Sequence, residues 1–210
     1  LKEVTFWEKK RILHIESWED KIVNTMLFSL LNKITGKHQS PYSYAYKHKS
    51  GGVDACQRAI IKYAKSHNCK YFIKRDISNY FPSIDHDLLL EKLDIKDDYL
   101  KKLIIQRIKF EYYPDDPEYS GEPLMNKKGV PFGTPLACFL ANWFLTDLDK
   151  EFESINVGYF RYADDFLIAA PTRSAAIAAM EALDCGLQKL NLQIKPSHTH
   201  QYSFEAEDEV

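Results

Sequence analysis

The chain has 210 residues, 45% of them hydrophobic and 28% charged, which is an ordinary globular composition for one large domain or two small ones. No apolar run is long enough to cross a bilayer and no signal peptide is visible, so a membrane partner is not expected. The four cysteines show no CxxC spacing, which argues against zinc or a disulfide framework and favours reduced thiols in the cytoplasm.

The net charge of −2 conceals an uneven distribution. Residues 1–74 carry 14 Lys and Arg against 6 Asp and Glu, a net of +8, which leaves −10 on residues 75–210. A basic front half suits contact with phosphate, and an acidic back half suits metal ions. A solvated surface with uneven charge would explain part of the same difference.

The first predicted elements are two short strands, at residues 4–7 and 12–15, on either side of a basic corner at Lys9-Lys10-Arg11. Ser17 then predicts the N-cap of a helix that runs to Thr35. Apolar residues at helical spacing predict the face of this helix that enters the core, namely Ile22, Met26, Leu27, Leu30 and Leu31.

Residues 40–52 interleave tyrosines with basic residues, and a helix from Asp54 to His67 follows. Aromatic rings of this kind can stack on nucleobases, and Lys47 and Lys49 can contact backbone phosphates. A rigid, tyrosine-rich loop packed on the domain is an equally good interpretation of the tyrosines.

A strand at residues 71–73 is predicted to deliver Asp76 at its end. Helices are expected at residues 87–93 and 97–110, and the polar residues 111–128, with three prolines, predict a loop. Beyond a glycine-containing turn, Thr134 and Pro135 are suited to start one long helix that reaches Phe152.

Aromatic and branched residues flank two adjacent carboxylates, Asp164 and Asp165, and predict a β-hairpin with the acidic pair near its tip. Two like charges between apolar strands repel, and a cation between them would relieve the repulsion. Oxygen ligands without nearby His or Cys favour Mg²⁺ or Mn²⁺. If the strand that ends at Asp76 is a neighbour, the carboxylates can share two metal ions, as in polymerases and nucleases. Taken alone, an Asp-Asp pair is more often a simple turn.

Several motifs occur in one order, namely DISNYFPSIDH at 76–86, GVPFGTPLACFLAN at 129–142, YADD at 162–165 and LNLQIKPSHT at 190–199. In these motifs the chain resembles reverse transcriptases of the prokaryotic retroelement type, which include group II intron, diversity-generating, retron and defence-associated enzymes. The resemblance implies an α+β fold: a right-hand polymerase palm, with an antiparallel sheet backed by helices, and partial fingers. Residues 1–70 would form the partial fingers with palm-joining helices, and residues 71–210 the palm. The primer grip and thumb of the family would be absent from this chain.

The resemblance also implies roles for the acidic residues. Asp76 and Asp164 would hold two Mg²⁺ ions, with Mn²⁺ as the alternative metal, and Asp165 would support them. The carbonyl of Ile77 would bind one of the ions.

Other positions match the family's nucleotide pocket. Arg11 would bind the triphosphate, and Phe81, five residues after Asp76, would act as a steric gate against the 2′-hydroxyl. The remaining members of this set are Asn79, Tyr80, Phe132 and Gly133. Phe132 replaces the family's usual Gln, and Ala137-Cys138 replaces its usual Ser-Pro. His198 stands where the family has a Lys that can protonate pyrophosphate, although a surface histidine in a turn is nearly as plausible.

The function implied is RNA-directed DNA polymerisation, with an RNA template, a DNA primer and dNTP as partners. One alternative is a template-independent or protein-primed relative that makes DNA in phage defence, which the departures at Phe132 and Ala137-Cys138 permit. Another is a non-catalytic nucleic-acid-binding palm, which would predict a lost carboxylate. A palm-fold nucleotide cyclase would need a GG(D/E)EF loop, which is missing.

Overall fold

The computed structural model describes residues 2–6, 9–35, 40–47, 51–114, 116–196 and 200–203, and for residues 2–6 and 9–13 it describes the backbone. The chain forms two compact units, and each unit combines two stretches of sequence. Unit 1 comprises residues 1–38 and 79–144, and unit 2 comprises residues 39–78 and 145–210. Helices and antiparallel sheet occur together, which confirms the predicted α+β class. The functional division into fingers and palm at residue 70 stays a prediction.

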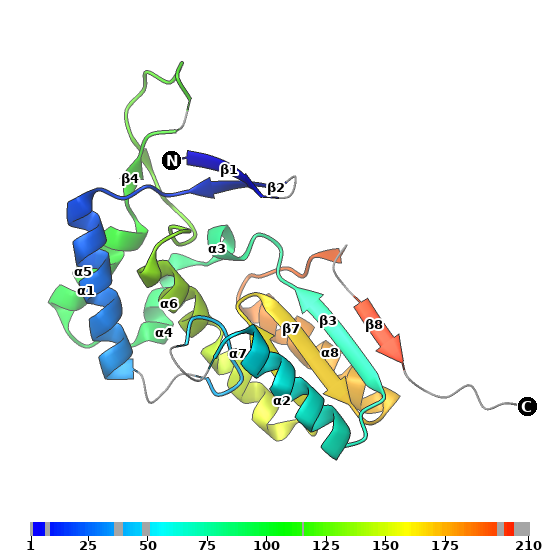
Figure 1. The fold of residues 1–210 in the computed structure, drawn as a ribbon. Coiled ribbons are helices and arrows are strands. Elements are labelled where there is room, and N and C mark those ends of the chain that lie inside the picture. Colours follow the sequence, from blue (N-terminus) through cyan, green and yellow to red (C-terminus); the bar gives the residue numbers. More distant parts are fainter. Residues whose placement is uncertain are drawn as a thin grey trace, which may run out of the picture. The chain divides into compact units, whose positions relative to one another are not determined.

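Unit 2 is built on a four-stranded antiparallel sheet, drawn in Figure 1. Its strand order is β6 (Gly158–Tyr162), β7 (Asp165–Ala170), β3 (Tyr71–Asp76) and β8 (His200–Ser203). Strands β6 and β7 form the predicted hairpin, with Ala163 and Asp164 as its two-residue turn. The strand that ends at Asp76 is the hairpin's neighbour, as expected.

Helices cover both faces of this sheet. Successive side chains of a strand point to opposite sides, so each face has side chains to bury. Helix α2 (Val53–Ser66) packs on one face, where Cys56 meets Phe160 and Ala169. Helices α7 (Thr146–Glu151) and α8 (Arg173–Lys189) belong to the other face. Figure 1 shows α2 in front of the sheet and α8 behind it.

Unit 1 is mainly helical. Its helices are α1 (Trp18–Thr35), α3 (Tyr80–Ser83), α4 (His86–Leu93), α5 (Asp98–Ile108) and α6 (Pro135–Phe144). Two strand pairs accompany them, β1 (Lys2–Phe6) with β2 (Lys9–Leu13) and β4 (Glu111–Tyr112) with β5 (Leu124–Met125).

Three local expectations need correction. The basic residues 9–11 belong to strand β2 and not to a corner. The loop at 111–128 contains the short pair β4–β5. The long helix expected from Thr134 ends at Phe144, because Leu145 leaves the helical conformation (φ −95°, ψ 0°). A new helix, α7, then starts at Thr146 and is followed by the 3₁₀ turn η2 (Phe152–Ser154).

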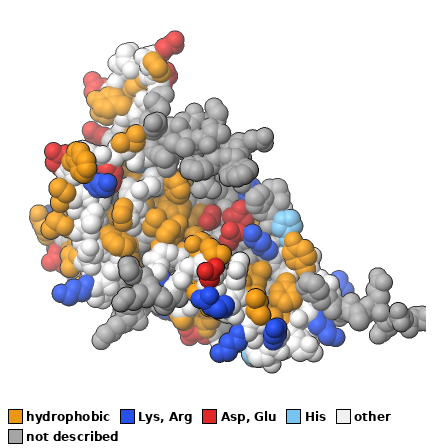
Figure 2. Space-filling view, in the orientation of Figure 1, with side chains coloured by type: hydrophobic (Ala, Val, Ile, Leu, Met, Phe, Trp, Pro, Cys, Tyr) orange, Lys and Arg blue, Asp and Glu red, His pale blue; other side chains and the backbone are white. Residues whose placement is uncertain are grey.

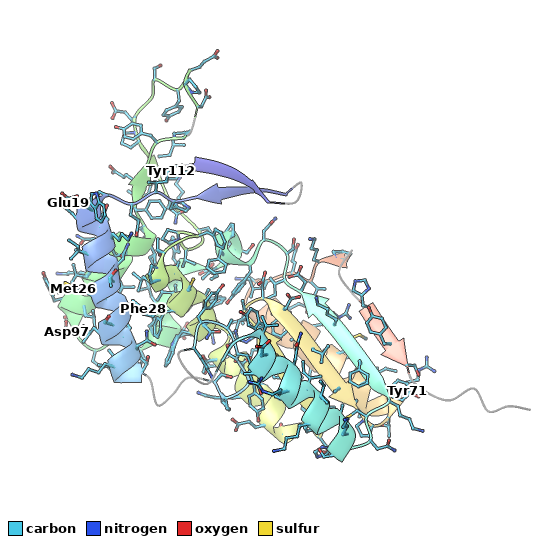
Figure 3. The ribbon with its side chains drawn as sticks, viewed as in Figure 1. Glu19, Met26, Phe28, Tyr71, Asp97 and Tyr112 are labelled. Carbon is cyan, nitrogen blue, oxygen red and sulfur yellow. The ribbon has the colours of Figure 1, made fainter. Side chains whose placement is uncertain are left out.

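The apolar face of α1 is also only partly the expected one. Leu27 and Leu31 are buried, and Phe28 makes an edge-to-face contact with Phe139 of α6 (ring centroids 6.4 Å apart). Met26 is 66% exposed, and Ile22 and Leu30 are exposed as well. Figure 3 shows Phe28 on the α6 side of α1 and Met26 on the opposite side, and Figure 2 shows apolar side chains exposed along the helix. The prediction that Ile22, Met26 and Leu30 enter the core is wrong, because α6 covers a face that is rotated toward Leu27 and Leu31.

Within the described ranges, none of the helices combines the length and apolar character that crossing a lipid bilayer demands.

Candidate active site

Two acidic residues from distant parts of the sequence stand opposite each other in unit 2. Asp76 at the end of β3 and Asp165 at the start of β7 are register partners in an antiparallel pair. Directly opposed residues of such a pair project their side chains to the same face of the sheet. Both side chains are partly exposed. The structure therefore brings together two of the three carboxylates that the sequence singles out.

The third carboxylate, Asp164, lies in the hairpin turn one residue before Asp165. Its carbonyl accepts a hydrogen bond from the Ile77 N–H (3.2 Å), which ties the turn to the residue after Asp76. The turn residue Ala163 has φ +56°, in the left-handed region that residues other than glycine seldom adopt. The turn is thus held in a conformation that its own sequence does not favour.

The donors present suit a hard cation. Mg²⁺ in phosphoryl-transfer sites is commonly held by one or two protein carboxylates together with substrate phosphate oxygens. Asp76 and Asp165 supply such a pair of carboxylates. No group of three His, Cys, Asp or Glu side chains within the described residues is arranged to hold a metal ion by itself. The carboxylates of Asp76 and Asp165 are of the type that holds Mg²⁺ together with substrate phosphate oxygens.

Lys74 lies beside the acidic pair. Its Nζ is 3.3 Å from Oδ1 of Asp165, and both side chains are nearly half exposed. An ion pair this exposed contributes little to stability. Lys74 therefore balances charge at Asp165 in a weak surface contact.

A buried ion pair supports the hairpin from the other face of the sheet. The guanidinium of Arg161 binds both carboxylate oxygens of Asp149 on α7, at 2.8 Å from Nε and 2.6 Å from Nη2, and both side chains are fully buried. The hydroxyl of Tyr159 also donates to Asp149 (2.7 Å). Burial and the Asp149 charge raise the pKa of Tyr159 well above its usual value, so this hydroxyl stays protonated.

The loop at 40–47 runs beside β6. The N–H of Arg161 donates to the Tyr42 carbonyl and the N–H of Tyr44 donates to the Arg161 carbonyl. Lys47 turns inward and donates to the carbonyl of Ser40, and burial, together with the Arg161 charge, lowers the pKa of Lys47. In this conformation the ammonium of Lys47 is engaged within its own loop.

Unit 1 brings together the aromatic residues of two motifs. Phe81 in α3 meets Phe132 edge to face, with ring centroids 5.1 Å apart, and Phe81 is buried. Asn79, at the N-cap of α3, has φ +46°, and the Tyr80 hydroxyl donates to the Ala141 carbonyl. Gly133 has φ +107°, a conformation that favours glycine.

The glycine turn is fastened to the segment that holds Phe81. The N–H of Val130 donates to the Phe81 carbonyl (3.0 Å), and a Cβ on Gly129 would lie 2.7 Å from the same oxygen. His86 is buried, and its Nε2 is 2.7 Å from the Gly129 carbonyl oxygen, which makes His86 a structural residue of this junction.

Several predicted residues are not placed in full. Arg11 belongs to β2, opposite Val4, and only its backbone is described. Lys49 and His198 lie outside the described residues. Lys195, three residues before His198, donates its N–H to the Asp76 carbonyl (2.8 Å), so its backbone borders the end of β3.

Sequence reasoning missed the Arg161–Asp149 pair. An arginine next to the YADD motif, between Phe160 and Tyr162 in a strand of otherwise apolar and aromatic residues, was a signal that a buried partner must exist. Nothing in the local sequence identifies Asp149 as that partner, because the same helix also carries the acidic residues Asp147 and Glu151.

The fold belongs to the right-hand polymerase class. Apo telomerase from Candida tropicalis superposes with a TM-score of 0.64 at 14% identity, over 90% of this chain and 37% of that chain. Telomerase from the same organism in complex with a TWJ fragment of telomeric RNA gives a TM-score of 0.66 at 15% identity, over 88% of this chain and 34% of that chain.

The chain belongs to the reverse transcriptase (RNA-dependent DNA polymerase) family, whose model matches residues 2–208. It is 29% identical to the COX1/OXI3 intron 2 protein of Saccharomyces cerevisiae over 148 residues, and 23% identical to the retron Ec73 reverse transcriptase of Escherichia coli over 190 residues. These alignments cover 69% and 82% of this chain, but only 16% of the intron protein and 54% of the retron enzyme.

Proposed function

We propose that this chain is the catalytic core of an RNA-directed DNA polymerase that adds dNTP to the 3′ end of a primer. The observation that carries the proposal is the register of β3 and β7, which sets Asp76 opposite Asp165 beside the YADD turn. Family membership and the shared fold support the same reaction. All three carboxylates of the family pattern are present in the sequence.

In the proposed reaction the primer 3′-hydroxyl loses its proton to water and its oxygen attacks the α-phosphorus of dNTP. The bond between that phosphorus and the oxygen that bridges the α- and β-phosphates breaks, and pyrophosphate leaves. The protein's contribution is to position these groups and to balance their charge. Asp76, Asp164 and Asp165 would hold two Mg²⁺ ions, with Mn²⁺ as a substitute and with the Ile77 carbonyl as a further ligand. When bound, such ions lower the pKa of the attacking hydroxyl and neutralise charge on the leaving group.

We assign the nucleotide pocket to the residues that match the family's motifs. Arg11 would grip triphosphate oxygens with its planar fork, and the amides of Asn79 and Tyr80 would contact the same group. Phe81 would exclude the 2′-hydroxyl of rNTP. Gly133 would allow close approach of the backbone to the nucleotide, and Phe132 would stack where the family has Gln. The fixed contact between Phe81 and Phe132 supports a shared role for the two rings.

The nucleic acid partners would be an RNA template and a DNA primer, by analogy with the telomerase solved with an RNA fragment. Lys47 and Lys49 are the proposed phosphate contacts, and Lys47 would have to release the Ser40 carbonyl to serve as one. His198 would protonate the departing pyrophosphate. The primer grip and thumb would be supplied by further domains, and the free thiols suit the cytoplasm.

A template-independent or protein-primed synthesis, as in phage defence, is the second candidate. It is favoured by Phe132 at the usual Gln position and by Ala137-Cys138 at the usual Ser-Pro. A non-catalytic nucleic-acid-binding palm is a third candidate, and the intact carboxylate set speaks against it.

The test is a primer-extension assay on the complete natural protein with an RNA template, a DNA template of the same sequence and no template. The proposal predicts extension that copies the RNA. If the arm without template gives as much extension as the arm with RNA template, and the product has a random sequence, the result would support template-independent or protein-primed synthesis. No incorporation in any arm, from folded protein supplied with Mg²⁺ or Mn²⁺, would support the third.

A further inference from the structure

We propose that the buried ion pair between Arg161 and Asp149 is a positioning device for the YADD turn, and that it sets the affinity of the carboxylates for metal. The inference rests on the proposed function, because it assumes that Asp76, Asp164 and Asp165 are the metal ligands. It adds two residues, on the far face of the sheet, to the machinery of the same site.

The pair is connected to the turn through a backbone carbonyl. Besides its two bonds to Asp149, the guanidinium of Arg161 donates from Nη1 to the carbonyl of Ala163 (3.1 Å). Ala163 is the residue with φ +56°, and it directly precedes Asp164. Because a peptide bond is planar, a carbonyl held in place fixes the plane of the peptide that joins Ala163 to Asp164. Arg161 therefore controls the orientation of the Asp164 backbone.

The ion pair acts from a position where it cannot itself bind the metal or the substrate. Arg161 alternates with Tyr162 along β6, so its side chain points away from the face that carries Asp76 and Asp165. Both members of the pair are fully buried. The contact with Ala163 gives the pair a path from this buried position to the turn.

The geometry of the pair is well suited to holding a strained turn. A planar guanidinium presents several donors in a rigid fork, so one side chain can serve Asp149 and Ala163 together. Asp149 is itself fixed by its helix, since its N–H donates to the Leu145 carbonyl. The chain of contacts therefore runs from α7 through Arg161 to the turn.

The decisive variant is Arg161→Lys, which keeps the buried positive charge but has no fork to reach both partners. The matched control is Tyr159→Phe, which removes a hydrogen bond to Asp149 and leaves the Ala163 contact intact. Asp149→Glu is a second test variant, because it keeps the ion pair and displaces the guanidinium. All are compared in the complete natural protein at a temperature where melting curves show each to be folded.

Two readouts are measured, the Kd for Mn²⁺ by electron paramagnetic resonance and the split between kcat and KM for dNTP. Because small displacements of reacting groups have large effects on rate, Arg161→Lys is expected to lower kcat by about tenfold or more and leave KM within about twofold. The Kd for Mn²⁺ should rise in parallel. Tyr159→Phe should leave both readouts near their original values.

The inference is overturned if the folded Arg161→Lys or Asp149→Glu protein matches Tyr159→Phe in Mn²⁺ affinity and kcat. It is also overturned if both test variants fail to fold, because the ion pair would then be required for folding and not for positioning the turn. Asp165→Asn is assayed in parallel: full synthesis by that variant would refute the proposed function itself, independently of Arg161.

Discussion

At the residue level, Ala163 in the YADD turn has a backbone conformation that few L-residues adopt. Its φ of +56° carries a cost of about 1 kcal/mol for an L-residue, whereas glycine adopts it freely. The YADD turn therefore stores a small amount of strain, which contacts from Ile77 and Arg161 counteract.

This strain predicts an unusual response to glycine. Ala163→Gly should change the unfolding free energy by less than about 0.5 kcal/mol. Glycine relieves the backbone strain at this positive φ, and that gain offsets the added conformational freedom of the unfolded chain. Ala178→Gly, at an exposed position inside α8, should cost about 1 kcal/mol because no such relief is available. Urea denaturation measures both values. If Ala163→Gly costs as much as Ala178→Gly, the turn is not strained.

We propose that the selection between dNTP and rNTP depends on Phe81. Phe81→Ala should lower the ratio of dNTP to rNTP incorporation efficiency by about tenfold or more, since a discrimination of 1.4 kcal/mol corresponds to a factor of ten. The control is Phe139→Ala, another buried phenylalanine of unit 1 at comparable burial, which should destabilise the protein and leave the ratio unchanged. An unaltered ratio in Phe81→Ala would exclude the steric gate.

At the scale of elements, α1 shows where apolar spacing is ambiguous. Leu27 is buried and Met26 is exposed, although both fit the spacing of one apolar stripe. Leu27→Ala should therefore cost about 2–5 kcal/mol, in the range of buried leucines. Met26→Ala should stay within about 0.5 kcal/mol, as for surface positions. If urea denaturation shows equal losses of unfolding free energy for the two variants, the exposed face of α1 is covered in the complete protein.

Elements with strong local signals could be predicted from the sequence. Ser17 caps α1 through the side-chain bond that its position suggested, and the aromatic flanks of the acidic pair form the hairpin. That the strand ending at Asp76 lies beside the hairpin was also predicted, whereas the register that opposes Asp76 to Asp165 comes from the structure.

Other features have no local signal. The break at Leu145 contains neither glycine nor proline, so propensity favoured one continuous helix there. The choice between the two apolar sides of α1 depends on which side α6 covers. The partner of Arg161 lies 12 residues earlier in another element, and only the folded chain brings it near. Tertiary packing decided each of these three cases.

At the scale of the whole molecule, the basic front half predicts salt-dependent binding of nucleic acid. Each phosphate contact contributes a slope of about −0.9 in log K against log salt for a DNA duplex, and less for a single strand. Lys47→Ala and Lys49→Ala should each weaken binding and flatten this slope. Lys96→Ala is the control, because Lys96 pairs with Asp94 at an exposed site in the acidic part of the chain. Unchanged slopes in both test variants would make the 40–52 loop a packed element.

We propose that Asp76 and the YADD carboxylates form the metal site of a nucleotidyl transferase. This assignment is tested by the rate of dNTP incorporation by Asp76→Asn in the complete protein, at saturating Mg²⁺ and with folding verified by its melting curve. Because the variant keeps the shape of the side chain and loses the charge that holds the metal, the rate should fall by about 1,000-fold or more, or roughly 4 kcal/mol of transition-state stabilisation. A rate within about tenfold of the unmodified protein, a loss of less than about 1.4 kcal/mol, would contradict the claim.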